Sequence, residues 1–495
     1  MKHAPEQDFD VAMEYRDVLI VGAGLSGINA AYRVHERNPQ LSYAILERRE
    51  NLGGTWDLFR YPGVRSDSDI FTLSYPYRPW EGEQSIADGG DIRQYLVDTA
   101  HEFGIDKNIA FGVHVVRADF DSSIDRWIVD ATVHGQPVTY SARFLYLCTG
   151  YYDYDQGYTP DFPGVSDFQG TVVHPQYWPE DLDYAGKKVV VIGSGATAIT
   201  LVPTMSRDAE RVTMLQRSPG YITVLPRVDK TGQKLRKLLP ARLAHRIIRV
   251  KNAGVALGFY LYCRRFPVHA RKTLRDLAIR ILPEGFDVDT HFNPTYDPWD
   301  QRLCVVPDAD LFRAIKSGKA DVVTDHIDHF DSAGITLSSG THLDADIVVT
   351  ATGLQVLAFG GIELRIDGVE LDPHSKFLYR GRMLEDVPNF AWSLGYTNAS
   401  WTLRADVTAK AVAELLHYMD ARGYTHAYPD RGGMSLPEVP ALDLQSGYIQ
   451  RSADVLPKSS TMRPWTFRQN VVLDNIDARR DKITQAMSFG TAGQR

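Results

Sequence analysis

The sequence predicts an α/β fold with two domains built on parallel sheets and a helical insertion in the second domain. Two glycine-rich turns, at residues 22–27 and 193–198, each follow directly on an apolar run. Between residues 227 and 299 a strongly basic segment with helical periodicity interrupts the second unit. Because the same strand–turn pattern occurs twice in 495 residues, two domains of one architecture are expected.

The first glycine-rich turn has the parts of a dinucleotide-binding site. Residues 17–21 form a β-branched run typical of a buried parallel strand, and the turn that follows has the pattern GxGxxG. Its glycines allow a tight bend, close approach of the backbone to a pyrophosphate, and close helix–strand packing. A second apolar run ends at Glu47, twenty residues beyond Gly27, where a carboxylate can accept hydrogen bonds from a ribose diol. We therefore predict a Rossmann-like site formed by Gly22, Gly24, Ser26, Gly27 and Glu47.

The second glycine-rich turn also follows an apolar run, but the next strand-like run ends in different residues. It follows the apolar run 188–192 and carries alanine at the third glycine position. The next strand-like run, 211–216, ends at Arg217 and Ser218 instead of an acid. A guanidinium pairs with a 2′-phosphate that a carboxylate would repel. The first site is thus predicted to bind FAD and the second NADPH, through Gly193, Ser194, Gly195, Ala196, Thr197, Ala198, Arg217 and Ser218.

Two further apolar runs suggest where the chain crosses between the domains. Residues 144–150 and 346–353 each end in Thr-Gly, as expected of strands that close a nucleotide-binding sheet. The FAD domain is accordingly predicted to comprise residues 1–150 and 360–495. The NADPH domain is predicted to comprise residues 151–226 and 300–359, with 227–299 as the basic helical insertion.

Composition excludes several classes of protein. With 44% hydrophobic residues and a net charge of −8, the chain is predicted to be globular and not a nucleic-acid binder. Its three cysteines lie far apart, so neither a disulfide framework nor a metal site is predicted. Residues 1–17 lack the apolar run of a secretory signal, which favours a cytoplasmic location.

The segment between the two turns carries a more specific pattern. Residues 168–179 read FxGxxxHxxxWP, with His174 at its centre and Trp178-Pro179 at its end. This pattern resembles the signature of class B flavoprotein monooxygenases of the Baeyer–Villiger type. The resemblance extends from about residue 15 to about residue 470, and it is strongest toward the ethionamide-activating monooxygenases of mycobacteria. It also rests on Gly53-Gly54-Thr55-Trp56, Tyr61-Pro62-Gly63, Asp67, Asp300-Gln301-Arg302-Leu303 and the run 395–402.

The resemblance implies a reaction and its participants. NADPH would reduce FAD, and reduced FAD would form a C4a-peroxide with molecular oxygen. The peroxide would insert one oxygen atom into a lipophilic ketone, giving an ester or lactone, or oxidise sulfur in a thioether or thioamide. Arg302 would stabilise the negative charge, Asp67 would hold Arg302, and His174 would couple the two domains.

The same resemblance implies further contacts. FAD would be contacted by Gly54, Thr55, Trp56, Asp57, Leu58, Asp67 and Val115. NADP would be contacted by Arg65, Ser66 and Asp67. The substrate pocket would be lined by Asn398 and Trp401. The aromatic residues Tyr448, Trp465 and Phe467 are expected either as lining or lid residues or as core.

Three other functions share parts of this pattern. A flavin monooxygenase that hydroxylates nitrogen or oxygenates sulfur, without ketone insertion, would share both nucleotide domains, but Trp178-Pro179 weighs against it. A disulfide reductase would need a redox cysteine pair, which the sequence lacks. A non-enzymatic redox sensor that merely holds FAD would not need Arg302, Asp67 and the linker pattern together.

The insertion is the most basic part of the chain. Residues 227–280 hold fifteen lysines and arginines against two acids, Asp229 and Asp276. Apolar residues at helical spacing predict two or three amphipathic helices there. The basic surface is either a solvated helix face or a site of weak contact with an anionic membrane, which would place the protein at the inner face of that membrane.

Overall fold

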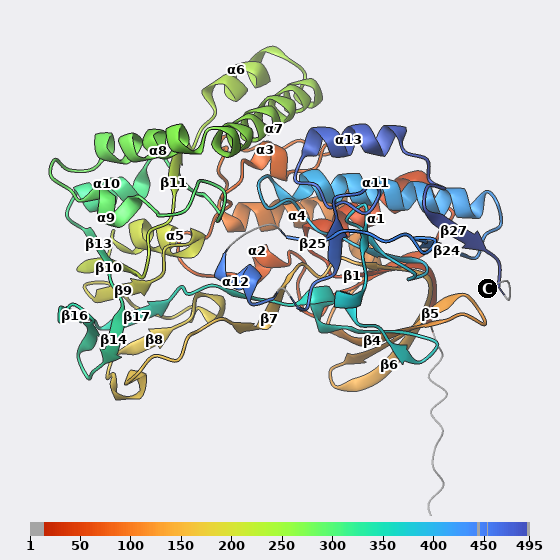
Figure 1. The fold of residues 1–495 in the computed structure, drawn as a ribbon, viewed down its shortest axis with the longest axis horizontal. Helices are drawn as coiled ribbons and strands as arrows, with labels where there is room; N and C mark the ends of the chain where they lie inside the picture. Colours follow the sequence, from red (N-terminus) through yellow and green to blue (C-terminus); the bar gives the residue numbers. More distant parts are fainter. Residues whose placement is uncertain (1–13, 443–445, 453, 493–495) are drawn as a thin grey trace, which may run out of the picture.

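The computed structural model describes residues 14–442, 446–452 and 454–492. The prediction that the N-terminal stretch carries no secretory signal falls largely on residues 1–13, which lie outside the described residues. Figure 1 shows two lobes, each built around its own sheet, with helices above both.

The first lobe holds a nine-stranded sheet. Its path runs β20-β19-β4-β5-β6-β1-β2-β3, and β23 pairs with β6 at a branch. The first glycine-rich turn joins β1 to helix α1 (Leu25–Arg37), as predicted. The strands are β1 (Glu14–Val21), β2 (Tyr43–Leu46), β3 (Ile109–Ala110), β4 (Val113–Asp121), β5 (Arg126–Val133), β6 (Gln136–Leu147), β19 (Glu363–Ile366), β20 (Val369–Glu370) and β23 (Phe390–Trp392).

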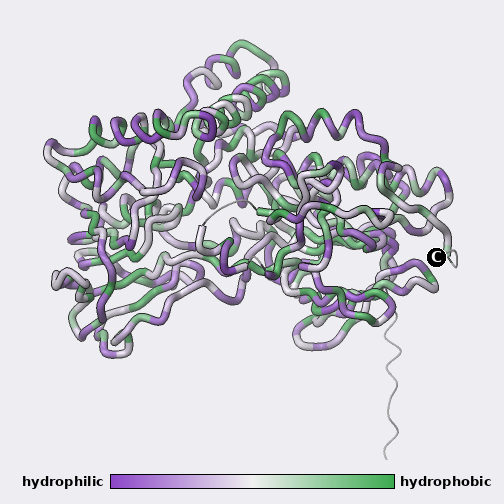
Figure 2. The backbone as a smooth tube through the Cα atoms, viewed as in Figure 1, coloured by the Kyte–Doolittle hydropathy of each residue, from purple (hydrophilic) through white to green (hydrophobic). Residues whose placement is uncertain are grey.

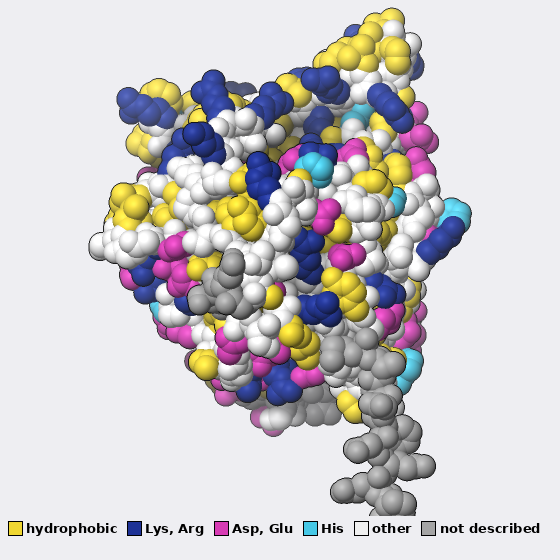
Figure 3. Space-filling view, turned by 90° about the vertical axis from the view of Figure 1, so that its right-hand side faces the viewer, with side chains coloured by type: hydrophobic (Ala, Val, Ile, Leu, Met, Phe, Trp, Pro, Cys, Tyr) yellow, Lys and Arg dark blue, Asp and Glu magenta, His cyan; other side chains and the backbone are white. Residues whose placement is uncertain are grey.

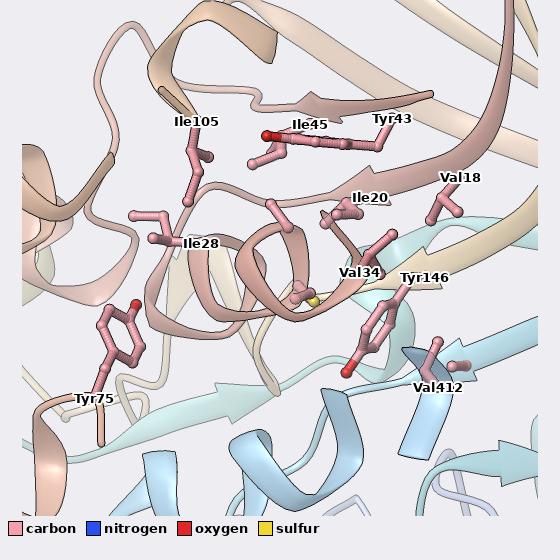
Figure 4. Packing of buried hydrophobic residues seen from close by; sticks show 14 of the residues in the cluster. Val18, Ile20, Ile28, Val34, Tyr43, Ile45, Tyr75, Ile105, Tyr146 and Val412 are labelled. Carbon is pink, nitrogen blue, oxygen red and sulfur yellow. The ribbon is translucent and has the colours of Figure 1, made fainter. Parts of the chain in front are cut away.

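The core of this lobe lies between the sheet and α1. Ile28 and Val34 of α1 pack in one cluster with Ile20 of β1 and Ile45 of β2, and all four are fully buried (Figure 4). Helix α11 (Trp401–Asp420) packs along α1 from the outer side. The C-terminal segment therefore belongs to the same lobe as the first glycine-rich turn.

The second lobe holds a five-stranded, all-parallel sheet in the order β13-β10-β9-β17-β8. Helix α5 (Ala196–Met205) follows the second glycine-rich turn, as predicted. The strands are β8 (Thr171–Val173), β9 (Lys188–Ile192), β10 (Arg211–Gln216), β13 (Ala320–Thr324) and β17 (Ile347–Thr350), with helix α10 (Asp310–Lys316) beside α5 and a small sheet of β14 (Ile327–Phe330), β15 (Gly334–Leu337) and β16 (His342–Asp344).

The chain crosses between the lobes twice. Strand β7 (Tyr152–Gly157) leaves the first lobe and β18 (Leu354–Val356) returns to it, and the two pair antiparallel between the sheets (Figure 1). Each crossing begins just after a predicted Thr-Gly return strand, because β6 ends at Leu147 and β17 ends at Thr350.

The insertion contains four helices, one or two more than the pattern predicts: α6 (Lys230–Leu238), α7 (Ala241–Arg265), α8 (Pro267–Ile281) and α9 (Val288–Phe292). Prolines set two of the breaks, since Pro240 precedes α7 and Pro267 begins α8. Asp287 caps the short α9, which the apolar periodicity could not reveal. Within the described residues, no helix is both long enough and apolar enough to cross a bilayer.

Shorter elements complete the lobes. They are α2 (Thr55–Leu58), α3 (Ile70–Leu73), α4 (Gly89–Glu102), β11 (Ile222–Leu225), β12 (Cys304–Pro307), β21 (Leu378–Tyr379), β22 (Met383–Leu384), β24 (His426–Pro429), β25 (Glu438–Pro440), α12 (Gly447–Gln450), β26 (Lys458–Ser460), α13 (Val471–Arg480) and β27 (Met487–Gly490).

A buried acid, Asp69, links α3 to α7, because its side chain is hydrogen-bonded to Asn252 of α7. Asp69 caps α3 by accepting a hydrogen bond from the Thr72 backbone N–H (3.0 Å), and burial raises its pKa from 3.8 to about 6. The native state therefore holds this proton to higher pH than the unfolded chain does. Native stability falls as pH rises through this range and stays lower above about pH 6.

Asp69→Asn should therefore raise the melting temperature above pH 6, because the amide keeps a capping oxygen without the buried charge. The gain should correspond to on the order of 2 kcal/mol and should disappear below about pH 4. Asp229→Asn is the matched control: Asp229 caps α6 and pairs with Lys251, and hydrogen bonds from Lys251 and the α6 backbone keep its pKa low despite burial. Its loss should lower stability at neutral pH. Equal gains for Asp69→Asn at every pH would contradict the electrostatic explanation.

Candidate active site

A cavity of about 570 Å³ lies between the two lobes. The first lobe, α5 and the C-terminal segment all contribute to its wall. Many of the predicted site residues line it together: Gly22, Gly24, Ser26, Glu47, Gly54, Thr55, Trp56, Arg65, Ser66, Asp67, Val115, Ala196, Arg302 and Trp401.

The first glycine-rich turn forms an open cradle. Gly22 has φ of +102°, and a Cβ on Gly27 would lie 1.8 Å from the carbonyl oxygen of Gly22, so both positions require glycine. Gly24 faces the cavity, and a Cβ on it would meet nothing nearer than Gly54, at 3.5 Å. Backbone can thus approach a ligand closely here, which fits the pyrophosphate of FAD.

Glu47 stands beside this cradle. Its carboxylate accepts hydrogen bonds from the backbone N–H of Ala23 (2.7 Å) and of Arg49 (2.9 Å). Burial raises the pKa of Glu47 despite these bonds. The carboxylate is thereby held rigidly at the end of β2 on the cavity wall, where the ribose of FAD would lie.

The Gly-Gly-Thr-Trp turn contributes a second strip of wall. Thr55 shares a hydrogen bond with the hydroxyl of Tyr152 (2.7 Å), which ties α2 to the crossing strand β7. Asp57 and Leu58 do not line the cavity. The Asp57 carboxylate is fully buried and pairs with three arginines, Arg49, Arg60 and Arg93, at 2.8–2.9 Å. Asp57 therefore braces this turn from behind.

Arg302 and Asp67 come together across 235 residues of sequence. A guanidinium nitrogen of Arg302 lies 2.6 Å from Asp67 Oδ2. The negative charge of Asp67 raises the pKa of Arg302 still further, so the cation is permanent. The side chain of Arg302 is 38% exposed and that of Asp67 24%, and both face the cavity. N–H groups of Arg302 therefore remain available to a ligand in the cavity. Next to Asp67, Arg65 pairs with Asp310 at the start of α10, at 2.5 Å.

The second glycine-rich turn lies along the other lobe. A Cβ on Gly193 would lie 2.3 Å from the Ala351 carbonyl, whereas a Cβ on Gly195 would meet nothing within 4 Å. Ser194 donates a hydrogen bond to the Ser218 carbonyl (3.2 Å), and Thr197 faces the buried hydroxyl of Tyr61. Ala196 is the one residue of this turn on the cavity wall, and Ala198 is buried in the core of the lobe.

Arg217 lies exposed at the end of β10, as the fingerprint predicts. Among the described residues, none forms an ion pair with it. Ser218 is exposed beside it. The open cradle at Gly195 and this free cation fit a phosphorylated dinucleotide such as NADPH.

His174 lies at the crossing between the lobes and not on the cavity wall. Its Nδ1 accepts a hydrogen bond from the Gln176 N–H (3.2 Å), and burial lowers its pKa. The ring fills the space beside Gly157 of β7, where a Cβ would lie 2.0 Å from it. This placement suits coupling of the two domains better than acid–base chemistry.

The two predicted pocket residues lie differently. Trp401 lines the cavity; its indole N–H donates to Ser26 Oγ (2.9 Å) and its ring stacks on Tyr151, with centroids 5.3 Å apart. Asn398 does not line the cavity, because its amide donates to the Gln469 carbonyl (2.9 Å). Trp465 is fully buried in the core, and Phe467 packs against Arg404.

Three tyrosines that line the cavity, Tyr151, Tyr152 and Tyr154, were not predicted from the sequence, whereas Tyr448 was expected as a lining or core residue and does line it. Tyr151 and Tyr448 face the Arg302 guanidinium, and Tyr152 and Tyr154 extend the wall along β7. One signal was available for three of them, since the tyrosine-rich run 151–154 follows the return strand at Thr149-Gly150. Tyr448 reaches the site only because the chain returns to the first lobe.

Comparison with known proteins agrees with this geometry. A family model described as flavin-binding monooxygenase-like matches residues 80–269, and an NAD(P)-binding Rossmann-like model matches residues 20–81. The FAD-containing monooxygenase EthA of Mycolicibacterium smegmatis is 50% identical over 473 residues, which is 95% of this chain and 96% of the relative. The chain belongs to the class B flavin monooxygenases.

Solved structures agree on the fold of this monooxygenase. A steroid monooxygenase bound to NADP superimposes with a TM-score of 0.77 at 23% identity, covering 96% of this chain and 100% of the other. Cyclohexanone monooxygenase from Rhodococcus sp. Phi1, bound to NADP+, gives 0.75 at 18% identity, covering 97% and 100%. The predicted fold, with two Rossmann-like domains, is confirmed, and it is the fold of Baeyer–Villiger monooxygenases. The predicted enzyme class, an FAD- and NADPH-dependent monooxygenase of that type, is also confirmed. As a monooxygenase, the protein uses molecular oxygen and an organic substrate.

Proposed function

We propose that this monooxygenase inserts one oxygen atom into lipophilic ketones, giving esters or lactones, and oxidises sulfur in thioethers and thioamides. The observation that carries the proposal is the Arg302–Asp67 pair on the cavity wall, at 2.6 Å. A fixed cation in a cavity of this kind can stabilise negative charge that develops on oxygen, as in an oxyanion hole. Ketone insertion needs that stabilisation, since the carbonyl oxygen becomes an alkoxide.

The protein's part in the reaction is to bind, orient and exclude water. When bound and reduced by NADPH, FAD supplies the chemistry that activates oxygen. Asp67 accepts one N–H of the Arg302 guanidinium, and Tyr151 and Tyr448 face the same group. The N–H groups that remain can donate to the oxygen that gains charge. The stacked rings of Trp401 and Tyr151 form an apolar wall beside this cation, which favours lipophilic substrates and excludes water.

A panel of substrates tests this proposal. The purified holoenzyme would be given NADPH with a long-chain aliphatic ketone, an aryl ketone or a thioether, and products would be measured by gas chromatography beside hydrogen peroxide. Ester from at least one ketone, formed in proportion to NADPH consumed, is the expected result. Sulfoxide without any ester would favour the sulfur-oxygenating alternative. NADPH consumption that yields only peroxide with every substrate would count against both reactions.

Arg217 should set the preference for NADPH over NADH. Arg217→Ala should raise the KM for NADPH by about ten- to a hundredfold, because it removes a charge-assisted contact with the 2′-phosphate. The KM for NADH should stay unchanged, since NADH has no such phosphate. Arg211→Ala is a matched control: Arg211 begins the same strand and pairs with Asp321. Equal loss with both coenzymes would show that Arg217 supports the fold and not the phosphate.

We also propose that the basic insertion makes a weak, electrostatic contact with the inner face of an anionic membrane. Fifteen cationic residues against two acids between residues 227 and 280 support it, in a chain with a net charge of −8. Such contact would bring the enzyme to lipophilic substrates. Sedimentation with anionic vesicles at low and high salt tests it, and absence of pelleting at low salt would eliminate it.

A further inference from the structure

Helix α7 has one face anchored in the protein. Ala244, His245 and Ile248 are buried against the first lobe. From the next turn, Arg249 donates hydrogen bonds to three backbone carbonyls, those of Phe71 (3.1 Å), Thr72 (2.7 Å) and Ser74 (2.5 Å). These carbonyls belong to the end of α3, whose chain continues back to Asp67 in the active site. The helix is therefore held in a fixed orientation close to the catalytic cavity.

The opposite face of α7 carries an exposed apolar stripe. Leu243, Ile247, Val250 and Leu261 follow the spacing i, i+4, i+7 and i+18, so they lie on one side of the helix. They are 46%, 39%, 68% and 50% exposed. Further exposed apolar side chains extend this surface at the neighbouring helix ends: Leu238 (79%), Phe266 (50%) and Val268 (74%). We call these seven residues the α7 stripe.

The stripe is framed by positive charge. Exposed cations flank it on the same three helices: Lys234, Lys237, Arg242, Arg246, Arg265 and Lys272. The two acids of the region are already paired, Asp229 with Lys251 and Asp276 with Lys272. Figure 3 shows yellow apolar and dark blue basic side chains gathered at the top of the molecule, and Figure 2 shows the alternation along the helices. This surface attracts anions and also exposes apolar side chains to water.

The combination of exposed cations and exposed apolar side chains distinguishes between possible binding partners. A second copy of the chain would place two strongly positive faces against each other, which is repulsive. A nucleic acid would use the cations but leave the apolar side chains unsatisfied. An anionic bilayer satisfies both, with phosphates for the cations and acyl chains for the stripe.

We propose that α7 lies within the interface of an anionic bilayer, with the α7 stripe inserted among the upper acyl chains. The inference rests on the proposed membrane contact and deepens it, from electrostatic attraction to insertion by a defined helix face. Because Arg249 fixes α7 on α3, insertion would hold the active-site cavity at the membrane surface. A lipophilic substrate would then reach the cavity from the bilayer instead of from bulk water.

A single labelled cysteine can test insertion, because the three native cysteines are all buried. Val250→Cys would carry an environment-sensitive fluorophore, with Gln136→Cys as the control at the exposed start of β6. Both holoenzymes would be mixed with phosphatidylcholine vesicles with and without phosphatidylglycerol. With anionic vesicles, we expect the fluorophore at position 250 to show a blue-shifted emission that is quenched by lipids with brominated acyl chains. The fluorophore at position 136 should show neither effect.

Other outcomes separate the two proposals. Pelleting without a blue shift would overturn insertion and leave the electrostatic contact standing. No pelleting with anionic vesicles would overturn both. A blue shift without lipid, together with a doubled mass in sedimentation velocity, would assign the stripe to a second copy of the chain.

Two double variants give an independent check. Val250→Ser with Leu261→Ser should lower partition into anionic vesicles by about tenfold, because both exposed side chains lose apolar surface that the bilayer would bury. Arg242→Ala with Arg246→Ala should weaken binding to anionic vesicles and make it less dependent on salt. When this variant also carries the fluorophore at position 250, the protein that still binds should keep the blue shift. NADPH turnover without vesicles should be normal in both, which would exclude a folding defect. Unchanged partition of the serine variant would overturn insertion.

Discussion

Arg302→Ala should abolish ketone oxygenation while the protein still holds FAD and is still reduced by NADPH. Loss of one preorganised donor to a developing oxyanion typically lowers turnover by about 10²–10³-fold. The fold should persist, since Arg302 is 38% exposed and its removal leaves no cavity in a core. Asp67 would lose its partner yet remain 24% exposed, so it would not be a buried unpaired charge.

The measurement compares ester formed with NADPH consumed. In Arg302→Ala we expect NADPH to be consumed and hydrogen peroxide to appear in place of ester. Arg302→Lys should recover part of the activity, because it restores the charge without the planar pair of donors. Arg117→Ala is the matched control: Arg117 also pairs with an aspartate, Asp130, but on strands β4 and β5, and neither residue lines the cavity. Normal ester formation by Arg302→Ala would remove Arg302 from the reaction.

Among the described glycines of the first lobe, Gly27 should tolerate replacement by alanine least. Its Cβ would lie 1.8 Å from a backbone carbonyl oxygen, so α1 would have to move away from β1. Overpacking of this kind costs about 3 kcal/mol, and it would also disrupt the cradle for the pyrophosphate. We expect a lower melting temperature and protein purified without FAD.

Gly195→Ala is the informative partner of that variant. No protein atom lies within 4 Å of the position its Cβ would take, so stability and FAD content should be unchanged. The methyl would instead project where the backbone approaches the pyrophosphate of NADPH, and the KM for NADPH should rise by at least about tenfold. Flavin absorbance per protein and the two KM values separate the effects. Retention of FAD by Gly27→Ala would contradict the contact geometry, and an unchanged KM in Gly195→Ala would place NADPH elsewhere.

The local features of the fold could be predicted from sequence because each is encoded by neighbouring residues. A glycine-rich turn between an apolar run and a helix specifies its own geometry, as Gly22 at φ +102° shows. Glu47 and Arg217 could be placed as well, since each follows a strand at a fixed distance from its turn. The exception among local features was the insertion, where proline and aspartate breaks divided the periodic pattern into four helices.

The roles of individual site residues depended on contacts across the chain. The pairing of Arg302 with Asp67 was suggested by family resemblance, and only the folded chain brings their atoms to 2.6 Å. Asp57 was expected at the cofactor, but three arginines from separate segments turn its carboxylate inward. Asn398 was expected to contact the substrate, but its side-chain amide donates a hydrogen bond to the backbone carbonyl of Gln469 in the C-terminal segment.

By itself, the sequence determined that this protein has two dinucleotide-binding domains, which nucleotide each should bind, and that a basic helical insertion interrupts the second. These properties follow from short-range constraints on backbone angles, strand ends and charge. The tertiary structure alone decided which side chains share the cavity, that Tyr448 joins Arg302, and that one face of α7 stays exposed. Those outcomes depend on packing between segments hundreds of residues apart, which no local pattern specifies.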